Sequence, residues 1–187
     1  MGPVAIVEGG RLTTDDLPRI FDQHGAMVYR RALRLLGSPA DAEDATQEIF
    51  IRAFRAVAGF DGRSSVATWL YAITTNYCLR LLRDCARRRE LDAENLGPPD
   101  PQSLVSVDKL LLLRHLLAIV DEELARAAVC VYLEGMSHAE AAEVLGVSKR
   151  TVGNHIERFL ALASAQAASG AALPAAGVAS LPRRRPP

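Results

Sequence analysis

Apolar residues recur at three- and four-residue steps along most of the chain, which is the period of an amphipathic α-helix. From Asp15 onward these positions are Leu17, Ile20, Phe21, Val28, Leu33 and Leu36. The run 37–39, Gly-Ser-Pro, ends that pattern, because Gly favours a helix C-terminus, Ser an N-cap and Pro a first turn. A second helix then aligns Ala42, Ala45, Ile49, Ala53, Phe54 and Val57 on one face. The pattern predicts two consecutive helices that share an apolar interface.

A turn-rich loop at 59–65 precedes a third predicted helix, which runs from about 65 to about 89. The end of this helix is basic, with five arginines against a single acid, Asp84; they are Arg80, Arg83, Arg87, Arg88 and Arg89. Prolines at 98, 99 and 101 prevent a continuous helix, so 92–106 is predicted to be an extended linker. Helical periodicity resumes over 107–163. The sequence therefore predicts an all-α protein with two small helical domains, 15–91 and 107–163, joined by a Pro-rich linker.

The two ends of the chain lack this periodicity. Residues 1–14 are Gly-rich and are expected to form a flexible arm, and residues 164–187 are Ala-rich and then Pro-rich, as in a disordered tail. The most apolar stretch, 110–120, is short and carries Arg114 and His115, so no membrane span is expected. The N-terminus has no signal-peptide pattern. These features predict a soluble, cytoplasmic protein.

The second domain contains the local chemistry of a helix-turn-helix. Ser137 and Glu140 form an S-x-x-E capping box, and Gly146 suits a tight turn between two helices. Ser148 can cap the next helix, on which Val152 and Ile156 are the inward anchors. The remaining polar positions are predicted to face away from the core and to contact DNA; they are Lys149, Arg150, Thr151, Asn154, His155 and Arg158.

Charge argues against an independent DNA reader. The whole chain has a formal net charge of +0. Residues 121–168 carry four basic and seven acidic side chains, which leaves this region negative. Because phosphate attraction supplies much of the affinity of DNA-binding proteins, this domain is expected to bind weakly by itself. Either this domain does not bind DNA, or another part of the chain or a partner supplies the affinity.

Two surfaces of the first domain could contribute. The second predicted helix carries an acidic and polar ridge, which a solvated helix face would also explain; it consists of Asp44, Gln47, Glu48 and Ile51. The third carries Trp69, Tyr71 and Tyr77 ahead of its arginines. Aromatic side chains among cations can stack exposed bases while holding the nucleic-acid backbone. Core packing is the alternative role for Trp69.

The sequence contains no motif that indicates a metal site, a cofactor site or an enzyme active site. The three cysteines, Cys78, Cys85 and Cys130, form no CxxC pair and are expected to be small buried side chains. The four histidines are scattered, and the chain has no HExxH, GxSxG or phosphate-binding Gly loop. No cofactor, metal site or catalytic residue is predicted.

Three segments together resemble a known family. They are "LGSPADAEDATQEIFIRAFRAV", "FDGRSSVATWLYAITTNYCLRLLR" and "EGMSHAEAAEVLGVSKRTVGNHIERF". In this order they resemble a bacterial RNA polymerase sigma factor of the extracytoplasmic-function (group IV) type, over roughly 15–163. The resemblance implies a factor that binds core RNA polymerase, reads −35 and −10 promoter elements and helps melt the −10 region. It also implies contacts with the β′ coiled coil and the β flap, and makes an anti-sigma factor a candidate partner.

The resemblance implies three sets of site residues. Polymerase docking falls to Asp44, Gln47, Glu48 and Arg52. Reading and melting of the −10 element falls to Phe60, Ser64, Trp69, Asn76, Arg80 and Arg83. Reading of the −35 element falls to Lys149, Arg150, Thr151, Asn154, His155 and Arg158. The chain departs from the family at Gly153 and His155, within a run that is commonly Thr-Val-Lys-Ser-Arg, and at Asp121, where a Pro is common.

Two other interpretations remain open from the residues alone. A transcriptional regulator that binds DNA without joining polymerase would explain 135–160, but would leave the acidic helix and the Trp/Arg helix without a role. A helical adaptor with a degenerate helix-turn-helix would bind a protein partner instead of DNA.

Overall fold

The structure is a computed structural model that describes residues 12–96 and 109–168. In these ranges the chain is helical and contains no strand, which confirms the all-α prediction. The longer helices are α1 (Leu17–Leu36), α2 (Pro39–Ala56), α3 (Val66–Leu96), α4 (Lys109–Ile119), α5 (Glu122–Ala128), α6 (His138–Leu145) and α7 (Lys149–Ala168). The short elements are η1 (Thr14–Asp16), η2 (Val57–Gly59) and a π-helical turn, η4 (Val129–Leu133). Within the described ranges, each helix is too short or too polar to cross a bilayer.

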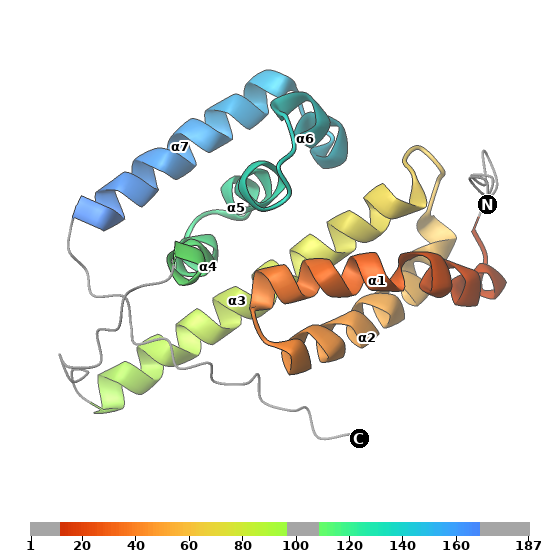
Figure 1. The fold of residues 1–187 in the computed structure, drawn as a ribbon, viewed down its shortest axis with the longest axis horizontal. Helices are drawn as coiled ribbons and strands as arrows, with labels where there is room; N and C mark the ends of the chain where they lie inside the picture. Colours follow the sequence, from red (N-terminus) through yellow and green to blue (C-terminus); the bar gives the residue numbers. More distant parts are fainter. Residues whose placement is uncertain (1–11, 97–108, 169–187) are drawn as a thin grey trace. The chain divides into compact units, whose positions relative to one another are not determined.

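The helices α1 and α2 form an antiparallel pair (Figure 1). Gly37 ends α1 in the left-handed region at φ 81°, and its N–H donates to the Leu33 carbonyl oxygen at 2.8 Å. The Ser38 hydroxyl accepts a hydrogen bond from the Asp41 N–H at 3.3 Å, with Pro39 in the first turn. The predicted break at 37–39 is confirmed.

The first compact unit extends to Tyr77, inside α3. Its core is made of fully buried side chains from three helices: Val28 and Leu35 of α1, Ile49 of α2, and Leu70 and Thr74 of α3. Phe21 and Phe54 belong to the predicted apolar faces of α1 and α2 but are not buried. Phe21 is 50% exposed and Phe54 is 52% exposed.

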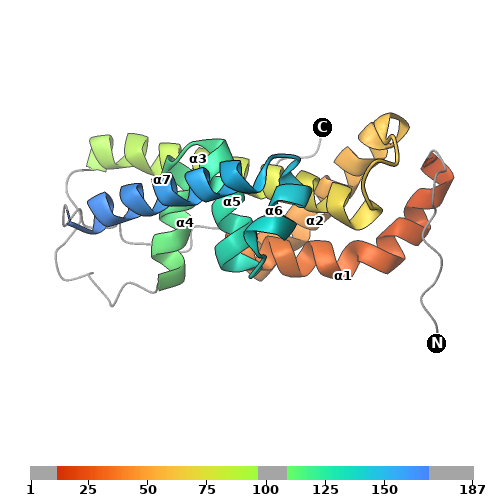
Figure 2. The same cartoon turned by 90° about the horizontal axis from the view of Figure 1, so that it is seen from above.

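The second compact unit runs from Cys78 onward and includes the end of α3. Its helices α5, α6 and α7 pack together, and α7 lies alongside α5 and α6 in both ribbon views (Figures 1 and 2). A cluster of small and branched side chains forms the contact; its buried members are Ala127, Cys130, Ala141, Ala142, Val152 and Ile156. The predicted anchors of the second helix are therefore confirmed as core residues.

Caps and turns of the helix-turn-helix also follow the prediction. Ser137 and Glu140 form the reciprocal capping box of α6. Gly146 ends α6 in the left-handed region at φ 68°. The Ser148 hydroxyl then accepts a hydrogen bond from the Thr151 N–H at 3.0 Å and caps α7.

Some element ends differ from the expectation. Helix α3 continues to Leu96, so the first residues of the predicted linker are helical. Helix α7 continues to Ala168, past the predicted start of the tail. In the predicted arm, Leu12 is buried and Thr14 begins η1. The rest of the arm, the linker from 97 and the tail from 169 lie outside the described residues.

Candidate functional site

The acidic and polar ridge on α2 divides into two parts. Asp44 and Gln47 are exposed. Glu48 and Arg52 are half-buried and form an ion pair at 2.9 Å, one helical turn apart. The Arg52 guanidinium also lies 4.8 Å from the centre of the Tyr77 ring on α3. The outer part of the ridge can meet a partner directly, whereas the Glu48–Arg52 pair also ties α2 to α3.

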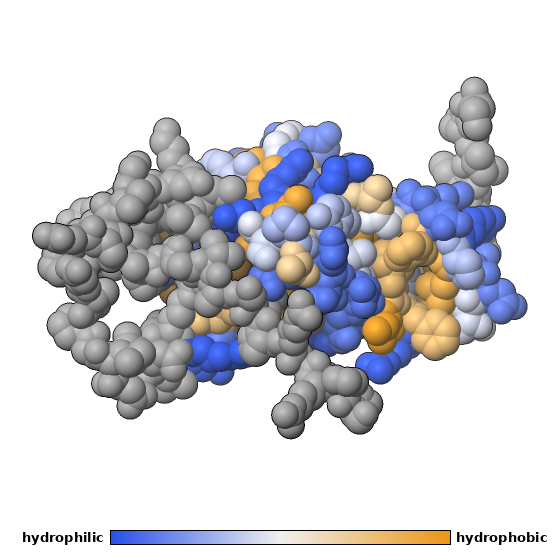
Figure 3. Space-filling model, turned by 60° about the horizontal axis from the view of Figure 1, so that its bottom comes forward, coloured by the Kyte–Doolittle hydropathy of each residue, from blue (hydrophilic) through white to orange (hydrophobic). Residues whose placement is uncertain are grey.

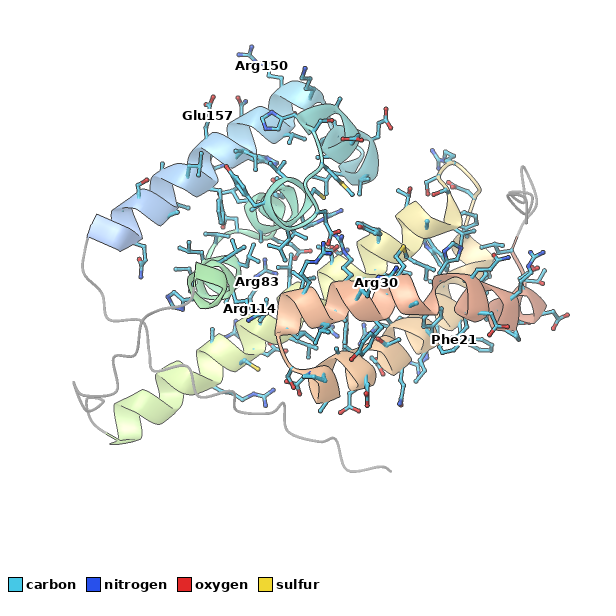
Figure 4. All side chains as sticks on the ribbon, viewed as in Figure 1. Phe21, Arg30, Arg83, Arg114, Arg150 and Glu157 are labelled. Carbon is cyan, nitrogen blue, oxygen red and sulfur yellow. The ribbon has the colours of Figure 1, made fainter. Side chains whose placement is uncertain are left out.

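An open apolar groove of about 440 Å³ lies beside this ridge. Its walls come from the start of α1 and the outer face of α2; the lining residues are Thr14, Leu17, Pro18, Phe21, Gln47, Phe50, Ile51 and Phe54. Apolar side chains gather over this part of the surface (Figure 3), and Phe21 is labelled on α1 in Figure 4. Exposed apolar patches of this kind mark interaction sites.

Sequence reasoning missed the groove although a signal was present. On α2, Phe50, Ile51 and Phe54 lie outside or at the edge of the buried stripe formed by Ala45, Ile49 and Ala53. An apolar stripe wider than one helix face indicates a second contact surface. Phe21 packs against Phe50 with ring centres 4.8 Å apart, so the half-exposed rings partly cover each other.

An aromatic pair joins the loop before α3 to the first residues of that helix. Phe60 is 8% exposed and its ring centre lies 5.2 Å from that of the half-buried Trp69. Ser64 is exposed, and Ser65 caps α3 by accepting a hydrogen bond from the Thr68 N–H at 3.0 Å. In this conformation the buried Phe60 ring packs against Trp69, and part of the indole remains exposed to solvent.

Farther along α3, the predicted contact residues share a helix face. Asn76 and Arg80 are exposed and lie one turn apart. Arg83 is half-buried, and its Nη1 lies 3.4 Å from Oε2 of Glu122 at the start of α5. Arg87 and Arg88 are exposed, whereas the side chain of Arg89 is outside the described residues.

The first turns of α7 present the predicted polar face. Lys149, Arg150 and Asn154 are exposed, and Arg150 points away from α5 and α6 (Figure 4). Thr151 is half-buried, and its hydroxyl lies 2.8 Å from that of Ser148. These side chains form a mixed basic and amide surface at the N-terminal end of a capped helix.

Two of the predicted −35 residues face α5. The His155 side chain is 14% exposed, and its Nε2 lies 3.7 Å from Oε2 of Glu123. Arg158 is largely exposed, and its Nη2 lies 3.6 Å from Oδ2 of Asp121. The expectation that His155 faces away from the core is wrong, because a contact from α5, distant in sequence, draws the ring inward.

The described residues contain no group of three His, Cys, Asp or Glu side chains that could hold a metal ion. Cys78 and Cys130 are buried, and Cys85 is half-buried. The predicted residues thus lie on three separate surfaces: the α2 ridge, the aromatic pair with the outer face of α3, and the first turns of α7.

Comparisons with known proteins match both parts of the chain. The family model for sigma-70 region 2 matches residues 20–89, and that for sigma-70 region 4 matches residues 110–161. The extracytoplasmic-function (ECF) RNA polymerase sigma factor SigE of Mycolicibacterium smegmatis is 36% identical over 151 residues, which cover 77% of this chain and 57% of SigE. SigM of Mycobacterium tuberculosis, also an ECF sigma factor, is 30% identical over 154 residues, which cover 82% of this chain and 76% of SigM.

Coverage differs among the relatives. The chain spans about half the length of the first relatives, since it covers 57% of SigE and 40% of SigG of Mycobacterium tuberculosis. Among solved structures, CnrH in complex with the cytosolic domain of CnrY is 25% identical, with a TM-score of 0.49 and coverage of 85% of this chain and 92% of that one.

Proposed function

Because the chain belongs to the extracytoplasmic-function sigma factors of the sigma-70 family, we propose that it binds core RNA polymerase and directs promoter-specific initiation of transcription. The observation that carries this proposal is the presence of both family regions in one chain, at 20–89 and 110–161. A stand-alone helix-turn-helix regulator requires only the second region. In this role the chain is a non-catalytic, cytoplasmic subunit, and the polymerase carries out RNA synthesis.

The proposed docking surface for polymerase is the outer face of α2. Asp44 and Gln47 are exposed, and Gln47 also lines the apolar groove. Polar groups around an apolar patch suit a protein–protein interface. We assign Asp44, Gln47, Glu48 and Arg52 to the contact with the β′ coiled coil, the last two through their ion pair. The β flap is the proposed partner of the second unit, and an anti-sigma factor is a further candidate partner.

The proposed −10 surface is the loop and outer face of α3. Extracting a base from the duplex costs a few kcal/mol, which stacking and hydrogen bonds in a pocket can offset. Trp69, supported by Phe60, offers the stacking surface, and the exposed Ser64 and Asn76 offer hydrogen-bonding groups. Arg80 and Arg83 are assigned to phosphates; Arg83 then exchanges Glu122 for DNA.

The proposed −35 surface is the N-terminal part of α7. In a helix-turn-helix the second helix enters the major groove and its first residues meet base edges. Lys149, Arg150 and Asn154 have the exposure and chemistry for this role, and Thr151 lies between them. His155 and Arg158 are assigned to the same surface, although both contact α5 in the absence of DNA.

The docking assignment can be tested with Gln47→Ala. Loss of a central polar contact in the interface should weaken binding of the full chain to core polymerase about tenfold, or about 1.4 kcal/mol. The measurement is a titration of fluorescently labelled full-length chain with core polymerase. Gln23→Ala on α1 is the matched control, because Gln23 is exposed and does not line the groove.

Two outcomes would contradict the assignments. If the unmodified chain did not bind core polymerase, the sigma-factor role would be wrong and a stand-alone regulator would be favoured. If Gln47→Ala and Gln23→Ala bound core polymerase equally well, the docking surface would lie elsewhere on the chain.

A further inference from the structure

Three consecutive acidic residues stand at the start of helix α5. The carboxylate of each lies within 4 Å of a basic side chain that we assigned to DNA contact. Asp121 approaches Arg158 at 3.6 Å, and Glu123 approaches His155 at 3.7 Å, both on α7. Glu122, between them, approaches Arg83 at 3.4 Å. The acidic start of α5 therefore lies against cations on which DNA binding is proposed to depend.

Helix stability does not explain where these side chains point. Acids at a helix N-terminus are favoured by the helix dipole, and Asp is a preferred N-cap because its carboxylate accepts hydrogen bonds from the first turn. Asp121 occupies the N-cap position of α5, but its side chain makes no capping hydrogen bond. Its carboxylate lies near Arg158 of α7 instead.

A carboxylate at this position competes with DNA in two ways. The Arg158 guanidinium cannot give its full charge to a phosphate while Asp121 remains beside it. Asp121 and Glu123 are also largely exposed, so they repel an approaching phosphate backbone. An exposed ion pair contributes at most about 1 kcal/mol, which is enough to change a DNA affinity severalfold.

We propose that Asp121 and Glu123 form an acidic clamp that competes with DNA phosphates for Arg158 and His155 and keeps the intrinsic DNA affinity of α7 low. The inference rests on the proposed function, because it takes α7 as the DNA-contacting helix. Its consequence is that the second unit stays off DNA unless another contact raises its local concentration. Docking of the chain on polymerase provides such a contact, since linked binding events need little affinity from each part.

If the clamp exists, substitution of its acids should increase the affinity of the chain for DNA. The full chain, without polymerase, is titrated against a fluorescein-labelled duplex of mixed sequence at low salt, and binding is followed by fluorescence anisotropy. Asp121→Asn should bind about threefold more tightly, and Asp121→Asn with Glu123→Gln about tenfold, in line with the loss of one weak ion pair and of two exposed negative charges. Loss of the helix-turn-helix fold is expected to lower the affinity, so the sign of the change separates release of the clamp from this kind of damage.

A general decrease in negative charge must be separated from release of Arg158. Glu157→Gln makes the same charge change on α7, at an exposed residue that points away from α5 and α6 (Figure 4) and has no ion pair within the described part of the chain. Each variant is then combined with Arg158→Ala. In that background the gain from Asp121→Asn should fall to the size of the Glu157→Gln gain, because only the part that comes from release of Arg158 is lost, whereas any gain from Glu157→Gln should persist.

Two results would overturn the clamp: no gain for Asp121→Asn, or a gain that persists unchanged with Arg158→Ala. Neither result depends on polymerase. Failure of the unmodified chain to bind core polymerase would instead contradict the proposed function and leave the clamp standing, so the two proposals can fail separately.

Discussion

Arg31 joins α1 to α3 through a cation that is only 3% exposed. Its Nε and Nη2 donate to the Thr75 hydroxyl at 3.1 and 2.7 Å, and its guanidinium lies 3.6 Å from the centre of the Tyr71 ring. A buried charge is costly unless its donors are satisfied and its stem is packed. Two of the three guanidinium nitrogens of Arg31 donate to Thr75 and its stem is buried, so Arg31 helps to fix how α3 packs on α1, immediately before the exposed Asn76.

Arg31→Ala should destabilise the first unit by about 2–3 kcal/mol, because it removes a packed stem, two hydrogen bonds and a cation–π contact together. Urea unfolding followed by the fluorescence of Trp69 measures this, since Trp69 is the one tryptophan of the chain and belongs to the same unit. The neighbouring Arg30→Ala is the control; Arg30 is exposed, and its loss should change stability by less than about 0.5 kcal/mol. Equal effects of the two substitutions would contradict the role of Arg31.

A second prediction concerns the capping box at the start of α6. Hydrogen bonds from the Ser137 N–H and, secondarily, the Ser137 hydroxyl hold the pKa of Glu140 below its ordinary value of 4.5. A carboxyl whose pKa is lowered by folding stabilises the folded state above its ordinary pKa, and this contribution is lost as the pH falls through the lowered value. The protection of α6 amides against hydrogen exchange should therefore decrease on acidification below about pH 4.5.

This acid dependence should be absent from Glu140→Gln and retained in Glu143→Gln, an exposed acid on the same helix. Ser137→Ala should lower the stability of α6 at neutral pH by about 1 kcal/mol, through loss of the N-cap. Identical acid dependence in the two glutamine variants would show that Glu140 does not stabilise the helix by capping it.

At the scale of elements, two glycines of the helix-turn-helix have opposite requirements. Gly146 forms the turn at φ 68°, a conformation that costs other residues about 1–2 kcal/mol. Gly153 lies inside α7, and a Cβ there would meet the Nδ1 atom of His138 at 4.0 Å, an ordinary contact distance.

Gly153→Ala should therefore stabilise α7 by about 0.5–1 kcal/mol, because alanine loses less entropy in a helix. Gly146→Ala should destabilise the same region by about 1–2 kcal/mol. Hydrogen exchange of the α6 and α7 amides measures both changes in the full-length chain. Destabilisation by Gly153→Ala would mean that the backbone near His138 is packed more tightly than the structure indicates.

Local chemistry predicted where most helices begin and turn. The Gly-Ser-Pro run at 37–39, the Ser137 capping box and Gly146 each determine their own backbone geometry, and each was confirmed. Helix ends in helix-forming sequence were less predictable. Helix α3 continues through residues that favour helix until Gly97 and Pro98, and α7 continues along an Ala-rich run.

Contacts between distant residues could not be predicted in the same way. Periodicity placed Lys149, Arg150 and Asn154 on an exposed face of α7, as observed. It could not show that Glu123 draws His155 inward, because η4 and α6 lie between the two partners along the chain. The groove at Phe21 and Phe54 was missed because apolar spacing indicates burial without saying by what.

At the scale of the whole molecule, the chain combines two units, neither of which has the features of an independent DNA-binding protein. The second unit carries acids against basic side chains that we propose to contact DNA, and the first carries an exposed apolar groove beside a polar ridge. Neither feature suits an isolated DNA-binding protein. Both suit a subunit that is first held by a large protein partner and then contacts promoter DNA at two places, since tethering replaces intrinsic affinity.

Run-off transcription with core polymerase and genomic DNA fragments tests this account most directly. The account predicts that adding the full chain to core polymerase yields discrete transcripts from a subset of fragments. It also predicts that Gln47→Ala reduces these transcripts while Gln23→Ala does not. If the unmodified chain produced no promoter-specific transcript from any fragment, the central claim that it is an initiation factor would be contradicted.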